Sequence, residues 1–239
     1  MTIDSSSPSR QLRTSWDDNA SAWTAAVREG RIPSRRAGTD AAIIAACQPY
    51  EARRILDVGC GEGWLARTLA APGRDVLGVD GSAGLIEAAN ALALDDESDS
   101  DSAGPVRFEV AGYETIAAND DVARGPFDLV VCNFALLDQD LVPLLRALAR
   151  RLSPGGTLLV QTVHSWMAMG DAPYRSGWRE ETFATFDVPF PTPMPWYYRT
   201  LGAWTESLRD AGLAVRMIEE PLHPETGRPL SMLLHCKHV

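Results

Sequence analysis

The sequence predicts an α/β fold built on a doubly wound, mostly parallel sheet. Three observations predict it: apolar runs of strand length alternate with helical patterns from residue 53 to 164, a glycine-rich turn follows the first run, and a Pro/Gly-bearing loop joins two final apolar runs. Parallel strands need long crossovers, so the alternation implies helices on both faces of the sheet. The 239 residues, 45% of them hydrophobic, suffice for one well-buried core.

The order of the elements follows from these patterns. Strands are expected at 53–59, 74–80, 106–112, 127–134 and 156–164, with helices at 64–70, 85–94 and 141–152. Residues 200–212 read as a helix with Thr200 as N-cap and Gly212 as its stop. The runs 213–221 and 231–239 then pair most simply as an antiparallel hairpin at the edge of the sheet.

The N-terminal region begins with a serine-rich stretch and continues as a predicted helix. The serine-rich start up to about Thr14 cannot bury apolar surface, and neither can the acidic stretch 95–104, so we expect both to lack structure. Residues 15–38 read as a helix in which Trp16 and Trp23 share one face.

Charge and composition exclude several classes of protein. The chain carries 22 basic and 32 acidic residues, a net charge of −10, and Lys237 is its only lysine, so DNA and RNA are repelled on average. No stretch approaches the roughly 20 apolar residues that cross a bilayer, and the start lacks the apolar centre of a signal peptide. We expect a soluble, cytoplasmic protein with no nucleic-acid and no membrane partner.

The cysteines indicate the same reduced setting. They form no CxxC pair, and three of them stand in apolar runs typical of a core; they are Cys47, Cys60, Cys132 and Cys236. His235 and His238 flank Cys236, but alternation along a terminal strand puts Cys236 on the opposite face. We therefore expect no metal site.

The glycine-rich turn indicates a ligand. In "ILDVGCGEG", Gly59, Gly61 and Gly63 stand at the first strand-to-helix turn, where a doubly wound sheet binds its ligand and where glycine lets the backbone approach closely. Asp80 ends the second strand, where a carboxylate can accept hydrogen bonds from both hydroxyls of a ribose. The dinucleotide fingerprint GxGxxG needs a glycine where Trp64 stands, so a nucleoside other than NAD is expected.

These residues resemble the class I S-adenosylmethionine-dependent methyltransferases, in particular their small-molecule group. Asp57 and the three glycines match the first motif of that family, and Asp80 matches its ribose-binding acid. The resemblance covers roughly 45–239 and implies a Rossmann-like, seven-stranded sheet with an antiparallel last strand, which agrees with the late hairpin. It also implies S-adenosylmethionine as the cofactor.

The resemblance extends to the N-terminal helix. Related small-molecule methyltransferases have a W-x-x-N-A-x-x-W opening that folds over the cofactor, matched here by Trp16, Asn19, Ala20 and Trp23. We therefore expect a tail and lid helix over 1–44, a methyltransferase domain over 45–239, and a substrate-lid insertion at about 165–199. Arg35 and Arg36 follow the helix; either reaches the cofactor carboxylate, or both are a solvated pair.

The resemblance implies a cofactor contact at each position that matches the family. Asp57 is suited to the methionine ammonium, directly or through water, while Gly112 and Tyr113 replace the acid that the family often has beside the adenine. Asn133 either faces the methionine arm or caps its strand. The expected cofactor-binding residues are Asp57, Gly59, Cys60, Gly61, Gly63, Asp80, Gly81, Ser82, Gly112, Tyr113, Asn133, Phe134, Trp23 and Arg35.

His164 is the candidate for catalysis, because it closes the fifth strand on the ligand side of the sheet. An imidazole takes a proton from a phenol or hydroxyl near neutral pH. Methyl transfer can also proceed by in-line placement alone, in which case His164 is structural.

The long insertion after the fifth strand is rich in aromatic residues, which favours either an acceptor pocket or a small accessory core. The expected substrate-binding residues are Trp16, Trp166, Met169, Tyr174, Trp196, Tyr197 and Tyr198.

The function expected from these observations is methyl transfer from S-adenosylmethionine to an O or N atom of a small aromatic or heteroaromatic acceptor, by a monomer or homodimer. The alternatives are C-methylation of a quinone-like ring and a cofactor-binding protein without catalysis, since a fold does not fix its acceptor.

Overall fold

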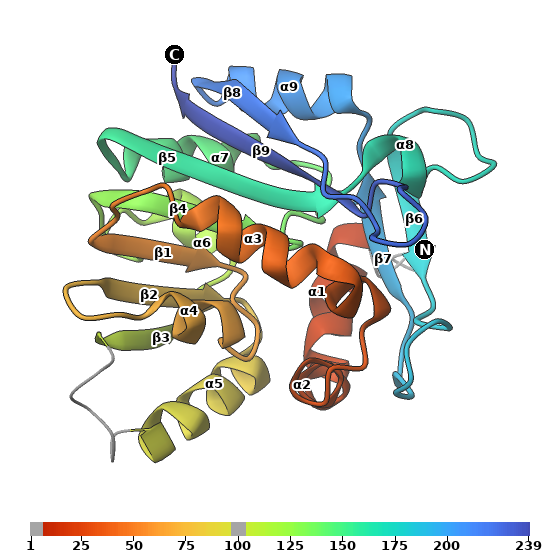
Figure 1. Ribbon diagram of the computed structural model, residues 1–239, viewed down its shortest axis with the longest axis horizontal. Coiled ribbons are helices and arrows are strands. Elements are labelled where there is room, and N and C mark those ends of the chain that lie inside the picture. Colours follow the sequence, from red (N-terminus) through yellow and green to blue (C-terminus); the bar gives the residue numbers. More distant parts are fainter. Residues whose placement is uncertain (1–6, 97–103) are drawn as a thin grey trace, which may run out of the picture.

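A computed structural model describes residues 7–96 and 104–239. Its centre is a seven-stranded sheet in the order β3-β2-β1-β4-β5-β9-β8 (Figure 1). The strands are β1 Arg54–Val58, β2 Asp75–Asp80, β3 Val106–Val110, β4 Phe127–Asn133, β5 Leu152–Val163, β8 Leu213–Glu219 and β9 Ser231–His238. The predicted doubly wound α/β fold is confirmed.

The first five strands are parallel, and β9 pairs antiparallel with both β5 and β8. The expected hairpin is confirmed, with β9 inserted between β5 and the edge strand β8. The fifth strand begins earlier than predicted, at Leu152, because the residues around Gly155 loop out between two stretches of pairing with β4.

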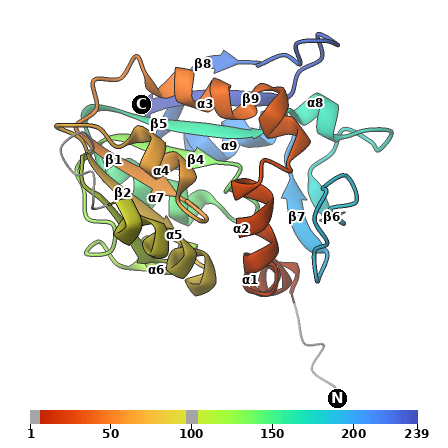
Figure 2. The ribbon, with the colours of Figure 1, turned by 60° about the horizontal axis from the view of Figure 1, so that its bottom comes forward.

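Helices cover both faces of the sheet (Figure 2). Apolar side chains of α3 (Asp40–Cys47), α4 (Trp64–Leu69) and α5 (Ala83–Asp96) pack in the cluster on one face. Those of α6 (Tyr113–Ala118), α7 (Val142–Arg150) and α9 (Leu201–Asp210) pack in the cluster on the other. In α9 the hydroxyl of Thr200 accepts the backbone N–H of Ala203 at 3.2 Å, which confirms the predicted N-cap, and Gly212 follows the helix at φ 82°.

The N-terminal region differs from the sequence-based prediction. A helix, α1 (Pro8–Asp18), already occupies part of the start expected to be unstructured, while residues 1–6 and 97–103 of the two predicted unstructured segments lie outside the described residues. The single helix expected over 15–38 is wrong: the chain breaks at Asn19, and α2 (Ala20–Arg28) follows. A kinked turn, η1 (Arg35–Thr39), in which Gly38 has φ 143°, then leads into α3.

The segment after β5 forms a separate small layer. It contains α8 (Ser165–Ala168) and a two-stranded antiparallel sheet of β6 (Gly177–Glu181) and β7 (Met194–Tyr198), which lies beside α1 (Figure 1). Phe183 and Met194 from this segment join Leu12 of α1 in a third apolar cluster, apart from the two main ones. Within the described residues, no helix has the length and apolarity needed to cross a membrane.

Candidate active site

A cavity of about 510 Å³ opens at the carboxyl ends of the parallel strands. The turns after β1, β2, β3 and β4 form its floor, while α1, α2 and residues 181–196 form its roof. Fourteen of the predicted site residues line it: Trp16, Trp23, Arg35, Gly59, Cys60, Gly61, Asp80, Gly81, Ser82, Gly112, Tyr113, Asn133, Phe134 and Trp196.

The three glycines have different structural roles, although all have positive φ. A β-carbon on Gly59 would overlap that of Ala135, so the turn after β1 fits against the turn after β4. Gly61 has no atom within 4 Å of such a β-carbon, since it faces the cavity. Gly63 does not line the cavity and instead lies against Phe108, where its role is close packing of α4 on the sheet.

Asp80 connects two of the turns that form the floor. Its carboxylate accepts the backbone N–H of Gly61 and that of Ser82, each at 2.9 Å. Burial raises the pKa of Asp80, and these two hydrogen bonds oppose the rise because they stabilise the ionised form. The carboxylate therefore fixes the glycine-rich turn while lining the cavity.

Asp57 lies beneath the same turn and does not line the cavity. It is 1% exposed, and one of its carboxylate oxygens is buried without a hydrogen-bond partner. Burial, followed by the negative charge of Asp80, raises the pKa of Asp57 to about 7. A cation bound above the turn would stabilise its ionised form.

Asn133 and Phe134 follow β4 at the back of the cavity. Asn133 lines the cavity, and its side-chain oxygen is buried without a hydrogen-bond partner among the described residues. Phe134 has φ 52° and lies at the turn beside it. On the opposite side Tyr113 donates its hydroxyl hydrogen to the carbonyl of Ala135, and burial raises its pKa.

Comparisons with known proteins agree with this geometry. Residues 55–156 match the family model described as a methyltransferase domain. A ubiquinone biosynthesis O-methyltransferase of Xanthomonas campestris pv. campestris (strain B100) is 34% identical over 113 residues, which are 46% of this chain and 43% of that protein. The chain therefore covers less than half of the length of these curated relatives. It covers 43% of the Xanthomonas protein and 45% of a second relative, from Ralstonia nicotianae.

Solved structures share the fold. An S-adenosylmethionine-dependent methyltransferase from Mesorhizobium loti has a TM-score of 0.55 and 24% identity, over 77% of this chain and 90% of that chain. Magnesium protoporphyrin IX methyltransferase from Synechocystis PCC 6803 with bound S-adenosylmethionine has a TM-score of 0.65 and 15% identity over 100% of both chains. The chain has the fold of S-adenosylmethionine-dependent methyltransferases, and residues 55–156 match a methyltransferase domain.

Some residues of the cavity wall were not predicted from the sequence. Glu62, inside the glycine-rich turn, is 2% exposed and accepts hydrogen bonds from Arg28 of α2 at 3.1 Å and Arg67 of α4 at 2.7 Å. Its other oxygen is buried without a partner. Arg35 pairs with Asp40 at 2.8 Å and lies 4.2 Å from the ring centre of Trp64, so it is not the solvated alternative. The pair of Arg28 and Glu62 has no local signal in the sequence, because the two residues are 34 positions apart.

The roof of the cavity is aromatic. Trp16 and Trp23 stack with ring centres 5.2 Å apart, although they stand on two different helices. Phe183 and Phe186 meet Trp23 edge-on at 5.4 and 5.7 Å, and both line the cavity. The insertion after β5 therefore contributes both to an accessory apolar core and to the wall of the cavity.

His164 lies outside the cavity wall, and its side chain is engaged elsewhere. Its Nε2 is 2.7 Å from a carboxylate oxygen of Glu220, and its Nδ1 accepts the backbone N–H of Met167 as the N-cap of α8. The neighbouring Val163 lines the cavity instead. This position favours the structural alternative for His164.

Five of the seven predicted substrate-binding residues also lie outside the cavity wall: Trp166, Met169, Tyr174, Tyr197 and Tyr198. Trp166 is 61% exposed and contacts Tyr174 on the surface, while Tyr198 is buried and donates its hydroxyl hydrogen to the carbonyl of Ser165. Alternation along β7 turns Met194 and Trp196 to the cavity and Tyr197 away, while Tyr198, at the end of the strand, does not line the cavity.

Three of the cysteines and His235 lie outside the site, whereas Cys60 lines the cavity. All four cysteines are buried and unpaired. His235 lies in the sheet between Tyr50 and Glu219, with both ring nitrogens 2.6 Å from an oxygen.

Proposed function

We propose that the chain transfers a methyl group from S-adenosylmethionine to an oxygen atom of a small, uncharged aromatic acceptor. The observation that carries the proposal is that one cavity joins a nucleoside-type floor, built by Gly61 and Asp80, to an aromatic roof. The names of the curated relatives, ubiquinone biosynthesis O-methyltransferases, support oxygen as the methylated atom.

The residues present fit the cofactor. Gly61 leaves open space beside its backbone, and Asp80 offers a carboxylate for the ribose hydroxyls. The unpartnered oxygens of Asn133 and Glu62 accept hydrogen bonds from the amino-acid end, beside the guanidinium of Arg35, which suits its carboxylate. Gly112 and Tyr113 line the side expected for the adenine.

Bound S-adenosylmethionine supplies an electrophilic methyl group on a positively charged sulfur. The protein then has to hold the acceptor in line with that methyl group and to exclude water, and such positioning accounts for much of the rate of a displacement reaction. Phe183, Phe186 and Met194 provide apolar surface against a planar ring, and Trp16 and Trp23 close the chamber above it.

The charges on the cavity wall disfavour an acceptor that has its own carboxylate. Among its described residues the only basic side chains are Arg13 and Arg35, and both are paired, Arg13 with Glu114 and Arg35 with Asp40, at 2.7 and 2.8 Å. Arg35 is also the cation assigned to the cofactor carboxylate, so an acceptor with its own carboxylate would find only the paired Arg13 among the described cations of the wall and would lose its hydration.

Glu181 is the candidate proton acceptor for a phenolic hydroxyl. It lines the cavity from the end of β6, and the backbone N–H of Phe183 fixes one of its oxygens at 2.7 Å. Asp138 also lines the cavity, but the hydroxyl of Ser9 and the backbone N–H of Gln139 already bond to one of its oxygens. Glu181 therefore retains more capacity to take the proton as the methyl group is transferred.

The experiment is an assay of the full chain with S-adenosylmethionine and a matched pair of catechols, one uncharged and one bearing a carboxylate. We expect S-adenosylhomocysteine and an O-methylated product, identified by mass spectrometry, from the uncharged member. Preference for the charged member contradicts the proposed acceptor class. Tight binding of S-adenosylhomocysteine with no turnover of any phenol, amine or quinol favours the alternative of a binding protein without catalysis.

A further inference from the structure

The roof of the cavity consists of two segments far apart in the chain, and Asn19 joins them. Asn19 stands between α1 and α2 and is 0% exposed. Its side-chain nitrogen donates to the carbonyl of Thr192 at 2.9 Å, while its side-chain oxygen accepts the backbone N–H of Thr192 at 3.1 Å. A carboxamide is the uncharged side chain that can donate and accept in this paired way.

The facing segment makes Thr192 an isolated anchor. Pro191, Pro193 and Pro195 surround it, and proline has no backbone N–H. Thr192 is therefore the only residue of 191–193 that can give both hydrogen bonds to Asn19. The fixed φ of the neighbouring prolines also limits the conformations of this segment before the contact forms.

The Asn19 contact lies next to the aromatic part of the roof. Trp23, four residues further on, meets Phe183, Phe186 and Phe190 edge-on at 5.4, 5.7 and 5.1 Å. Separating α2 from residues 183–192 would expose these rings together. The pair of hydrogen bonds and the ring contacts thus open or close as one unit.

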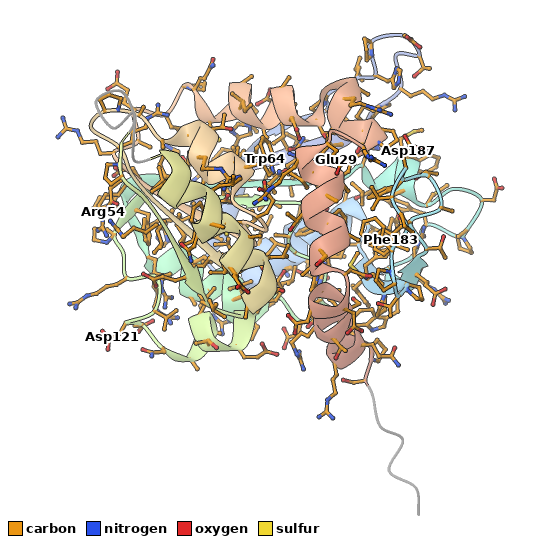
Figure 3. The ribbon with its side chains drawn as sticks, turned by 90° about the horizontal axis from the view of Figure 1, so that it is seen from below. Glu29, Arg54, Trp64, Asp121, Phe183 and Asp187 are labelled. Carbon is orange, nitrogen blue, oxygen red and sulfur yellow. The ribbon has the colours of Figure 1, made fainter. Side chains whose placement is uncertain are left out.

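Helix α2 is attached at its other end and along its side as well. After α2, Arg31 donates to the carbonyl of Asp187 at 2.8 Å in an exposed contact, and Figure 3 shows Glu29 at the end of α2 beside the segment with Phe183 and Asp187. Arg28 holds the helix to Glu62 of the glycine-rich turn and to the carbonyl of Ala88. The contact at Asn19 uses a side chain that is 0% exposed, whereas the Arg31 contact is exposed, so water competes less for the hydrogen bonds of Asn19.

We infer that Asn19 is a positioning residue that latches the roof over the bound cofactor, and that opening of this latch limits the rate of cofactor release. The inference rests on the proposed function, since it assumes that the cavity holds S-adenosylmethionine and its product. The walls contributed by Trp16, Trp23 and Phe183 enclose that space from above. A ligand on the floor leaves only when these walls separate, and Asn19 then loses both partners.

The test uses the full chain with S-adenosylhomocysteine as the probe and stopped-flow tryptophan fluorescence, to which Trp16 and Trp23 contribute. Asn19→Ala and Asn19→Asp should raise the dissociation rate constant roughly tenfold to a hundredfold, the effect of two lost hydrogen bonds, and change the association rate constant far less. Thr192→Ala is the matched control, because the contact uses only the backbone of Thr192. It should release the probe at the wild-type rate.

Thermal unfolding of each variant separates latching from general support of the fold. If Asn19 only supports the fold, its substitution lowers the melting temperature but leaves the dissociation rate constant unchanged when that rate is measured 20 °C below the melting temperature of the variant. That result, in either Asn19 variant, overturns the inference. If Asn19→Ala does not fold, Asn19→Asp, which keeps the size and loses the donor, decides alone. A wild-type chain that binds no S-adenosylhomocysteine refutes the proposed function instead.

Discussion

Gly59 and Ala135 lie so close together that a methyl group on Gly59 would overlap the side chain of Ala135. This contact holds the turn after β1 against the turn after β4, while Gly61, two residues on, faces open space. The two glycines should therefore respond differently to the same substitution.

Gly59→Ala should destabilise the fold, whereas Gly61→Ala should mainly weaken cofactor binding. Both add the strain of positive φ, about 1–2 kcal/mol. Gly59→Ala adds the repacking of Ala135, typically about 1–3 kcal/mol. Gly61→Ala instead places its methyl group in the cofactor space and should lower affinity for S-adenosylhomocysteine at least about tenfold, or 1.4 kcal/mol. Urea unfolding and calorimetry measure the two effects; equal loss of stability in both variants contradicts the assignment.

Asp80→Ala should cost about 1.5–3 kcal/mol of cofactor affinity, the range for hydrogen bonds to a charged group. The variant also leaves the N–H groups of Gly61 and Ser82 without their acceptor, so the glycine-rich turn should become more mobile. Titration calorimetry with S-adenosylhomocysteine and with NAD checks both affinity and specificity. Unchanged binding would place the ribose elsewhere, and preferential binding of NAD by the wild type would refute the cofactor.

The pKa of Asp57 predicts how stability and binding change with pH. Its pKa is about 7 in the folded protein and 3.8 as its ordinary value, so the folded state holds this proton more tightly. The contribution of Asp57 to the stability of the free protein should therefore be complete below about pH 4 and should be lost as the pH rises through about 7. Asp57→Asn should remove that part of the pH dependence in denaturant unfolding between pH 4 and 8.

Cofactor binding should act on Asp57 in the opposite direction. The ammonium group above the turn favours the ionised carboxylate, so binding at pH 6 should release a proton and affinity should rise toward pH 8. Calorimetry in two buffers of different ionisation enthalpy counts the proton. Asp57→Asn should release none; a wild type that also releases none contradicts contact with the ammonium, direct or through water.

The sheet could be predicted from the sequence because its strands are buried on both faces. Residues of β1, β2 and β4 are almost all enclosed, which requires the apolar runs from which they were predicted. The floor of the site could be predicted for a related reason. Gly59, Gly61 and Asp80 work within a few residues of a strand end, so their roles depend on local geometry.

The roof could not be predicted, because its geometry depends on contacts between distant residues. At Asn19, where α1 ends, the side chain bonds to Thr192, 173 positions away, and no pattern within residues 15–38 indicates a break there. The same reason applies to the contact between Glu62 and Arg28 of α2, which are 34 positions apart. One available signal was missed: Pro8 fits the first turn of a helix and marks the start of α1.

Substitution of His164, which follows β5, and of Glu181, which ends β6, should affect catalysis differently. His164 lies outside the cavity wall and bonds to Glu220 and the N-terminus of α8, while Glu181 lines the cavity. With a hydroxyl acceptor whose pKa lies well above 7, Glu181→Gln should slow methyl transfer by a factor of about 10²–10⁴, the loss typical of a general base. His164→Ala should leave the rate within about threefold and cost about 1 kcal/mol of stability through the lost N-cap.

Single-turnover rates from pH 6 to 9, with cofactor binding measured separately, distinguish the two residues. If Glu181 is the base, Glu181→Gln slows the single-turnover rate across this pH range, whereas the rate stays unchanged if Glu181 only supports the fold. Glu180→Gln on the same strand is the matched control, because Glu180 does not line the cavity. A large loss in His164→Ala with none in Glu181→Gln would return the proton transfer to His164, and it would require α8 to move so that the imidazole reaches the acceptor.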